Sequence, residues 1–478
     1  AINVNIDGTS TWNVTADSTP DGVLNNAGTV NFGSNAADGF KQVRVSDYNG
    51  DPATSKLLMK TDINSASNTD QIYATNQATG GSSVTIYNTA NSGVERSQAL
   101  LLADNGGGSN LTLANYDEET GGVKYLHAGA WKYSLVKSTT GASGEEWYLK
   151  RGDKITPDTP PDKGLTTTGE AIAAGAFLHD VWYTETNTWN SRMGIYRDKT
   201  WNGGLWISAA ANREDFDQIH DNTLADRQDF ATGTIGYDKK FKVKGGDFWG
   251  GVMAGYGETD SSLVAGIGDA DMKSYHMSLY GIYRMENGFY INGILKFNEY
   301  DSELTVNKPD NFTRYVLGYD QVKGDWRQYG LGISLQTGKR FDIGENGWYW
   351  EPQMQFSWNR VFGTSYKTDS GIAVDIDDID YIRLRGGIVL GRSWTLQNDT
   401  LLDLYADASI IHDFDADTRV TMSGGAYTST LGGTWGVYGI GANWRYRPGK
   451  FFHVRFQYSN GEPFVEPFAV YLGMSWEM

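Results

Sequence analysis

The stretch Phe468-Ala-Val-Tyr-Leu-Gly-Met-Ser-Trp-Glu-Met478 closes the chain and decides how the rest of it is interpreted. Apolar residues occupy its even positions, whereas the odd positions are small, polar or charged. Successive residues of a β-strand point to opposite faces, so the pattern predicts a strand with one apolar and one polar face. Its length matches the roughly 9–11 residues that a tilted strand needs to cross a bilayer. The segment therefore predicts one strand of a membrane β-barrel.

The composition of the 478-residue chain agrees with an all-β protein. It holds 59 Gly, 28 Tyr, 19 Phe and 16 Trp, which suits tight turns and the aromatic girdles of membrane barrels. No run of apolar residues is long enough for a transmembrane helix. The net charge of −18 argues against nucleic-acid binding, which needs basic surfaces. The absence of cysteine suits export through an oxidising compartment.

Residues 1–155 are rich in Asn, Thr, Ser and Gly. Short strands separated by Asn/Gly turns favour a parallel β-helix, a solenoid of stacked coils. Because the spacing is irregular, a β-sandwich remains open for this region. The alternating runs are 2–6, 29–32, 83–87 and 110–114. A stiff, proline-rich linker is predicted at 156–165.

The segment 166–198 carries a convincing helical pattern. Thr167 and Glu170 form a capping box, and apolar residues then recur near helical spacing. Taken alone, this pattern favours an amphipathic helix packed against a soluble domain. About 30 residues at ~1.5 Å rise would also give on the order of 45 Å, enough to cross a membrane-sized barrel. The apolar positions are Leu178, Val181, Trp182, Trp189 and Met193.

From residue 199 to the C-terminus, the alternation between apolar and polar residues is sustained. The polar set is too large and too charged for a packed core, so we expect apolar side chains to face lipid and polar ones to face a lumen. The pattern predicts a 12-stranded antiparallel barrel. The strands are expected at 203–214, 229–241, 248–259, 271–285, 288–300, 322–339, 348–361, 379–393, 401–412, 434–446, 451–459 and 468–478.

The connections between these strands alternate in length. Those after even-numbered strands are tight turns, such as 285–288 and 447–450, whereas those after odd-numbered strands are mostly longer. Short periplasmic turns and long outer loops produce this parity, which places the C-terminus in the periplasm. The long connections are 301–321, 362–378 and 413–433.

Charged residues are predicted at lumen-facing positions. Arg383 and Arg385 share the inward parity of one strand, and they could pair with inward carboxylates or contact the helix. Such ion pairs favour a plugged pore, and the functional rival is a constriction that selects a substrate. The candidate carboxylates are Glu351, Asp403 and Asp407.

Motifs for catalysis are missing from the sequence. Six histidines are scattered, and no His-Glu-x-x-His, Gly-x-Ser-x-Gly or Walker loop occurs. We therefore expect no enzyme activity, no cofactor and no metal site. The acidic run Asp375-Ile-Asp-Asp-Ile-Asp380 could hold Ca²⁺, but the favoured interpretation is a solvated outer loop.

Several segments, in the correct order, resemble a monomeric autotransporter of the type V (type Va) secretion class in Gram-negative bacteria. Residues 10–15 and 23–32 look like the last coils of a pertactin-like passenger, and 182–197 looks like the pore helix and its junction. Residues similar to the close of the family's autochaperone region are Gly129, Trp131, Tyr133, Leu135, Trp147, Tyr148 and Leu149. The resemblance assigns to the pore helix Leu178, Trp182, Glu185, Asn187, Trp189, Arg192 and Met193.

The resemblance implies four parts: a right-handed β-helix passenger end at 1–155, a linker at 156–165, a pore-spanning helix at 166–198 and an outer-membrane barrel at 199–478. It implies a translocator that exports its own passenger to the cell surface and anchors it there, with the helix plugging the pore. The expected partners are outer-membrane lipid and lipopolysaccharide, Sec export, periplasmic chaperones and the barrel-assembly machinery. A monomer is expected, and no nucleic acid. The alternative is an outer-membrane channel or porin with an extracellular β-helical adhesin or binding domain.

Two departures from the family pattern matter. Gly473-x-x-Trp476-x-Met478 resembles the C-terminal signal read by the barrel-assembly machinery, but the family usually ends in Phe or Trp. Self-cleaving members carry paired asparagines in the helix, whereas here Asn187 precedes Thr188. We therefore expect a passenger that stays tethered.

Overall fold

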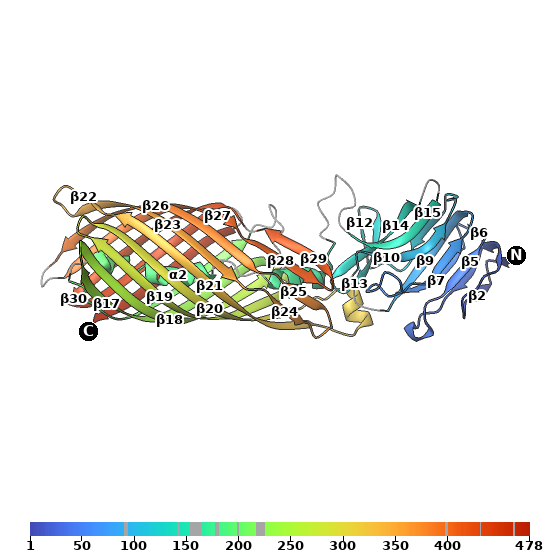
Figure 1. Ribbon diagram of the computed structural model, residues 1–478, viewed down its shortest axis with the longest axis horizontal. Helices are drawn as coiled ribbons and strands as arrows, with labels where there is room; N and C mark the ends of the chain where they lie inside the picture. The colour runs from blue at the N-terminus through green and yellow to red at the C-terminus, as the bar shows by residue number, and fades with distance from the viewer. Residues whose placement is uncertain are drawn as a thin grey trace.

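The computed structural model describes residues 1–89, 94–140, 144–152, 164–176, 181–197, 200–216, 225–396, 400–430, 432–461 and 464–478. Figure 1 shows an elongated molecule, in which a large barrel carrying the C-terminus is joined end to end with a smaller β-domain that carries the N-terminus. Apart from residues 164 and 165, the predicted linker lies outside the described residues.

The N-terminal domain is a solenoid of parallel strands. One face runs β1-β3-β6-β9, a second runs β2-β4-β7-β9-β11, and a third runs β5-β8-β10, so the parallel β-helix is confirmed and the β-sandwich is excluded. Successive coils place apolar residues directly above one another: Val30 pairs with Leu57, and Leu57 pairs with Val84, in a buried ladder. The bounds are β1 (Ile2–Ile6), β2 (Thr11–Asn13), β3 (Asp21–Asn26), β4 (Thr29–Asn31), β5 (Gln42–Val45), β6 (Asp47–Gly50), β7 (Lys56–Thr61), β8 (Gln71–Ala74), β9 (Ala78–Asn88), β10 (Arg96–Ala103) and β11 (Asn110–Leu113).

An antiparallel unit closes the solenoid. It consists of β12 (Glu118–Thr120), β13 (Val123–Ala128), β14 (Trp131–Thr140) and β15 (Gly144–Arg151), and β15 pairs with β10 of the last coil. The tight turn between β13 and β14 uses Gly129 at a φ of 60°, where a glycine avoids the steric cost of a Cβ. The side chains of Trp131 and Tyr133 on β14 and of Leu149 on β15 are buried.

Among the described residues, the helical segment is interrupted by a turn at residues 191 and 192. It comprises α1 (Thr167–Gly175), α2 (Val181–Asn190) and α3 (Met193–Arg197), and residues 177–180 lie outside the described part. The N-cap of α1 is Thr166 instead of the predicted Thr167, because the Thr166 backbone is extended and its hydroxyl accepts the N–H of Gly169 at 3.2 Å. Within the described residues, no helix combines the length and apolarity that crossing a bilayer requires.

The C-terminal part is a closed antiparallel barrel, and the twelve predicted strands are confirmed. Its last strand pairs with its first, from Gly204 with Glu477 to Phe216 with Phe464, so neither edge is left open. The strands are β16 (Gly203–Phe216), β17 (Ala225–Val243), β18 (Gly246–Leu263), β19 (Gly268–Met285), β20 (Phe289–Val306), β21 (Val322–Lys339), β23 (Trp348–Val361), β26 (Ile379–Thr395), β27 (Leu401–Asp415), β30 (Thr434–Arg447), β31 (Lys450–Gly461) and β32 (Phe464–Glu477).

The connections carry more structure than the sequence indicated. The outer connections 362–378 and 413–433, expected as plain loops, hold a separate four-stranded sheet made of β24 (Thr364–Lys367), β25 (Ala373–Ile376), β28 (Asp417–Met422) and β29 (Gly425–Thr430). The expected loop at 301–321 is shorter, because β20 continues to Val306. At the opposite end, β22 (Phe341–Ile343) extends the turn between β21 and β23.

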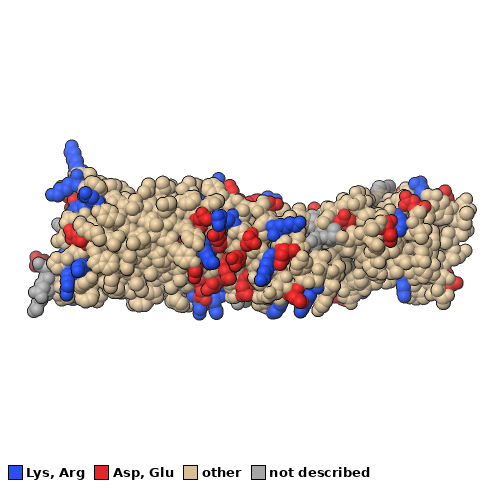
Figure 2. All heavy atoms as spheres, turned by 90° about the horizontal axis from the view of Figure 1, so that it is seen from below, with Lys and Arg blue, Asp and Glu red and all other residues tan. Residues whose placement is uncertain are grey.

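The two faces of the barrel wall have the predicted polarity. In the last strand, Phe468, Leu472 and Met474 are exposed, whereas Tyr471 and Ser475 are buried toward the lumen. On the face seen in Figure 2, a stretch of the barrel without charged side chains lies between Lys and Arg at the rim near the C-terminus and a mixed, largely acidic zone on the other side. Such a band is the surface that contacts lipid in membrane barrels.

Candidate functional site

The lumen of the barrel is the candidate functional site, because α2 and α3 lie inside it. All residues of α2 except Asn190 are buried, including polar ones, so its contacts are with the inner barrel wall. Gly332 of β21 gives the room that this needs, since a Cβ added there would lie 2.8 Å from the Trp182 ring. The helix is thus held on all sides by inward-facing side chains.

A buried ion pair joins the middle of α2 to the wall. The Lys296 ammonium on β20 contacts the Glu185 carboxylate and donates to the Trp182 carbonyl at 3.0 Å. Asn298 Nδ2 donates to the same carboxylate at 2.7 Å, and Ser274 Oγ lies 3.0 Å from that amide. Both charges are fully shielded from solvent, so breaking the pair would leave an uncompensated charge inside the lumen.

A second buried network surrounds Arg192, between α2 and α3. Its guanidinium lies 3.4 Å from the Asp238 carboxylate on β17 and 4.1 Å from the centroid of the Trp206 ring. Asp238 also accepts hydrogen bonds from Tyr196 at 2.6 Å and from Tyr280 at 2.9 Å. One carboxylate therefore gathers donors from the helical segment and from strand β19.

The end of α3 is anchored by a third set of charges. Arg197 donates to the Glu351 carboxylate at 2.6 Å and lies 4.0 Å from Asp403. Tyr290 donates to Glu351 at 2.9 Å. Arg284 of β19 donates to the carbonyl of Arg197 at 3.0 Å, which satisfies a backbone group at the helix C-terminus. Glu351 and Asp403, both predicted to face the lumen, therefore meet the helical segment through one arginine.

The two predicted lumenal arginines meet the expected groups in part: Arg385 pairs with Asp407 and Arg383 contacts the helix, but the carboxylate partner of Arg383 is Asp413. Arg383 forms a two-pronged ion pair with Asp413, at 2.7 Å to each oxygen, and its guanidinium lies 4.3 Å from the Tyr183 ring of α2. Arg385 donates to Ser409 at 3.0 Å and lies 3.8 Å from Asp407. The stronger partner of Asp407 is Arg455, at 2.7 Å.

The remaining predicted helix residues are placed as follows. Trp189 is buried with its ring 4.9 Å from that of Tyr280, and the Met193 sulfur accepts a hydrogen bond from Asn292 at 3.4 Å. Asn187 accepts from Asn190 at 3.1 Å. Leu178 lies outside the described residues.

The spaces beside α2 are small. A cavity of about 50 Å³ lies between the helical segment and the wall near Asn190, Arg385 and Asp407, and another of about 20 Å³ lies near Trp182 and Tyr183. A wider opening of about 500 Å³, lined in part by Gly194 and Arg197, lies beside α3 at the mouth nearest the C-terminus. Among the described residues, no group of His, Cys, Asp and Glu is arranged to hold a metal ion, the run 375–380 included.

The outer end of the barrel contacts the closing unit of the solenoid. Trp131 Nε1 donates to the Met422 carbonyl of β28 at 2.9 Å. Gly425 of β29 lies so close to Trp131 and Arg151 that an added Cβ would be 2.6 Å and 2.2 Å from their side-chain atoms. Thr168 of α1 donates to Asp310 at 2.6 Å. The solenoid therefore rests on the loop sheet above the barrel mouth.

The autochaperone-like residues belong to the unit that closes the solenoid. Trp131, Tyr133 and Leu149 are core residues, whereas Leu135 and Tyr148 are only partly buried. Trp147 donates to Ser109 Oγ at 2.9 Å, which fixes β15 against the last coil. Glu145 caps that coil: although burial opposes it, hydrogen bonds from Lys137 and Ser109 lower the pKa of its carboxyl group.

At the C-terminus, Gly473 faces inward against His453, whose ring would lie 2.5 Å from an added Cβ. Trp476 and Met478 share the outward face, and Met478 is 77% exposed. Lys296, Asp238, Asp413 and Arg455 also contact the helix or its ion pairs, but sequence reasoning missed them. Inward parity was the signal that could have found Lys296, Asp238 and Arg455, whereas Asp413 lies just beyond the predicted strand end at residue 412.

Two protein families match the chain. The family described as Autotransporter beta-domain matches residues 205–459, and the family described as Pertactin matches residues 22–151. The two matches together cover most of the barrel and most of the solenoid. Both matches agree with the resemblance seen in the sequence, one in the N-terminal part of the chain and one in the C-terminal part.

Individual relatives agree with these families. The pertactin autotransporter of Bordetella parapertussis is 28% identical over 67% of this chain and 34% of its own length. The BrkA autotransporter of Bordetella pertussis is 25% identical over 97% of this chain and 43% of its own length. The solved β domain of the Bordetella autotransporter BrkA aligns with a TM-score of 0.49 and 22% identity, over 58% of this chain and 100% of that one. The chain spans about a third to a half of the length of these curated relatives.

Proposed function

From the premise that this chain belongs to the autotransporter family, whose β-domain matches residues 205–459, we propose that its barrel exports the N-terminal domain across the outer membrane and anchors it at the cell surface. One observation carries the proposal. The segment that joins the two domains runs through the barrel lumen, so the solenoid lies at one mouth and the C-terminus at the other.

The contacts of the helical segment support a plugged pore after export. Three arginine or lysine networks hold it, and the spaces beside α2 have volumes of about 50 and 20 Å³. A solute-selecting channel needs an open path of water, which such packing does not leave. The porin alternative is therefore not favoured.

We propose that the solenoid folds from its closing unit outward and that this folding drives export. Each coil of a solenoid contacts only its neighbours, so a stable end can template the next coil. The closing unit holds three of the four largest fully buried aromatic side chains of this domain, Trp131, Tyr125 and Tyr133, the fourth being Tyr48 of β6. It also rests on the outer loop sheet, where an emerging chain would first meet a folded surface.

We propose no catalytic role for this part of the chain. One relative, of Escherichia coli O127:H6, is named serine protease EspC, and the match covers 27% of its length. Sec export, periplasmic chaperones and the barrel-assembly machinery are proposed as partners in biogenesis. The mature protein is proposed to be a monomer without nucleic-acid partners.

Protease treatment of intact cells tests the orientation. If the proposal is right, trypsin removes residues 1–152 while the barrel and its periplasmic turns stay protected. A variant with a protease site inserted in the turn at Gly245, at the other end of β17, should be cut only after the outer membrane is permeabilised. Protection of the solenoid in intact cells would contradict the assigned orientation.

A further inference from the structure

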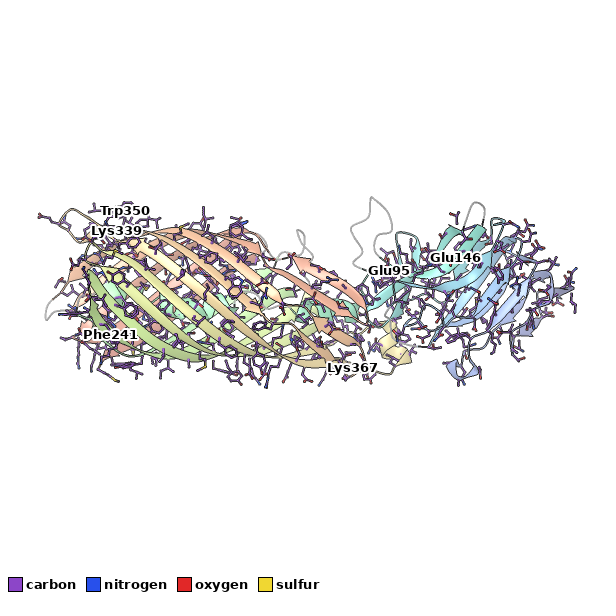
Figure 3. The ribbon with its side chains drawn as sticks, in the orientation of Figure 1. Glu95, Glu146, Phe241, Lys339, Trp350 and Lys367 are labelled. Atoms are coloured by element: carbon purple, nitrogen blue, oxygen red, sulfur yellow. The ribbon has the colours of Figure 1, made fainter. Side chains whose placement is uncertain are left out.

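An aromatic cluster lies on the outside of the barrel at the rim nearest the C-terminus. Phe341 of β22 stacks on Trp350 of β23 with ring centroids 4.8 Å apart, and Ile343 pairs with Trp348 two register positions further along. These four side chains are 36–48% exposed on the outward face. Figure 3 labels Trp350 together with Lys339 at this rim. The cluster thus continues the lipid-facing band to its periplasmic edge.

Two cations flank this aromatic surface. Lys339 Nζ lies 5.0 Å from the centroid of the Phe341 ring, and the Arg392 guanidinium lies 5.5 Å from that of Trp348 and 5.0 Å from that of Trp394. Neither cation forms an ion pair with any carboxylate in the described part of the chain. Their neighbour Arg340 differs, because it pairs with Asp342 at 2.9 Å.

The charge of the barrel exterior is unequal at its two ends. Lys239 and Lys450 stand at outward positions of the same rim. At the other end, carboxylates pair across strands, as Asp260 does with Asp271 and Asp271 with Glu303. Figure 2 shows both zones on either side of the uncharged band. A basic rim beside an apolar band matches a membrane leaflet with negative head groups.

The position of the two cations indicates that the ligand carries a phosphate group. A side chain just beyond the lipid-facing band meets phosphate groups, and Arg and Lys bind phosphate oxygens strongly when no carboxylate competes. The aromatic rings between them sit at the level where head group and acyl chain join. A zwitterionic lipid brings its own ammonium group to this surface, whereas an anionic one leaves its phosphate to the protein.

We propose that the rim cluster, defined as Lys339, Phe341, Trp348, Trp350 and Arg392, binds the phosphate head group of an anionic phospholipid in the inner leaflet of the outer membrane. The proposal rests on the proposed function, which places this rim on the periplasmic side. It adds a specific lipid contact that neither export nor anchoring of the passenger requires.

The test compares the full chain with two double variants in nanodiscs. One set of discs holds phosphatidylethanolamine alone, and the other holds phosphatidylethanolamine mixed with phosphatidylglycerol. Lys339→Gln with Arg392→Gln removes the two cations of the cluster. Lys273→Gln with Lys367→Gln removes two exposed cations from the opposite end and is the matched control. Lipid retained after release from the disc is measured by native mass spectrometry.

We expect the unchanged chain and the control to retain phosphatidylglycerol, and the cluster variant to bind it about 30-fold more weakly. Equal retention by all three proteins, equal retention of phosphatidylethanolamine, or an equal loss in the control would overturn the proposal. A cluster variant that instead loses a periplasmic protein captured by cross-linking, with lipid unchanged, would also overturn it. Trypsin accessibility of the solenoid on cells expressing each variant keeps a failure of this lipid site distinct from a failure of the export function.

Discussion

The guanidinium of Arg192, between α2 and α3, lies 3.3 Å from the hydroxyl of Ser475 on the last barrel strand. The same group lies 3.4 Å from Asp238 on the second strand. Because the first strand pairs with both of these strands, one side chain of the helical segment spans the seam where the barrel closes. Seating of the segment and closure of the barrel are therefore physically coupled.

Replacing Arg192 by Met should destabilise the closed barrel. Asp238 would remain buried without its cation, a loss that costs about 3–5 kcal/mol in comparable buried pairs. We expect the temperature at which the barrel loses its folded mobility on a denaturing gel to fall. Arg192→Met combined with Asp238→Asn should recover part of that fall, because the uncompensated charge is gone. An unchanged unfolding temperature in the single variant would show that the coupling is absent.

The sequence predicted the barrel strands because each carries an alternation that needs no knowledge of its neighbours. The ion pairs across the lumen could not be predicted in this way. Lys296 and Glu185 are separated by 111 residues, and only the strand register and the depth of the helix bring them together. Arg383 was expected near an inward carboxylate or against the helix, and it does contact Tyr183 of α2. Its carboxylate partner Asp413 was missed because it lies just beyond the predicted strand end at residue 412.

The loop sheet was missed for a related reason. Its four strands hold 4–6 residues each, too few for alternation to stand out, and they pair between two different connections. The burial of the polar residues of α2 could not be predicted either, because only a lumen lined with hydrogen-bond partners can bury them. Glu185 has no helical neighbour that could neutralise it, so its environment was set entirely by the barrel wall.

Two carboxylates on the outer half of the barrel should respond oppositely to loss of charge. Asp271 lies between Asp260 and Glu303 in the cross-strand register, so Asp271→Asn should stabilise the barrel by roughly 0.2–1 kcal/mol. Asp301 instead pairs with Arg327 at 2.6 Å, so Asp301→Asn should destabilise it by a similar amount. Unfolding temperatures at low and high salt measure both effects, which should shrink as salt rises. A shift of the same sign in both variants would refute the charge argument.

The contact between solenoid and loop sheet should depend on Gly425. Gly425→Ala places a Cβ 2.6 Å from the buried Trp131 ring and 2.2 Å from Arg151, so the ring or the hairpin must move. We expect faster hydrogen exchange in β28 and β29, and faster cleavage at the junction by added protease. Gly233→Ala is the matched control, because its Cβ would meet nothing within 4 Å. Equal exchange in both variants would mean that this contact does not hold the junction.

Conductance across planar bilayers tests whether the helical segment closes the pore. The full chain should conduct little, because every residue of α2 except Asn190 is buried against the barrel wall and the spaces beside α2 are small. Deletion of residues 1–197 should raise single-channel conductance sharply, since it leaves a lumen lined by Lys296, Asp407 and other polar side chains. Deletion of residues 1–152 is the control: it removes the solenoid but keeps the helical segment, and its conductance should stay low. A large conductance in that control would assign the closure to the solenoid instead, and a large one in the full chain would restore the channel as the function of this barrel.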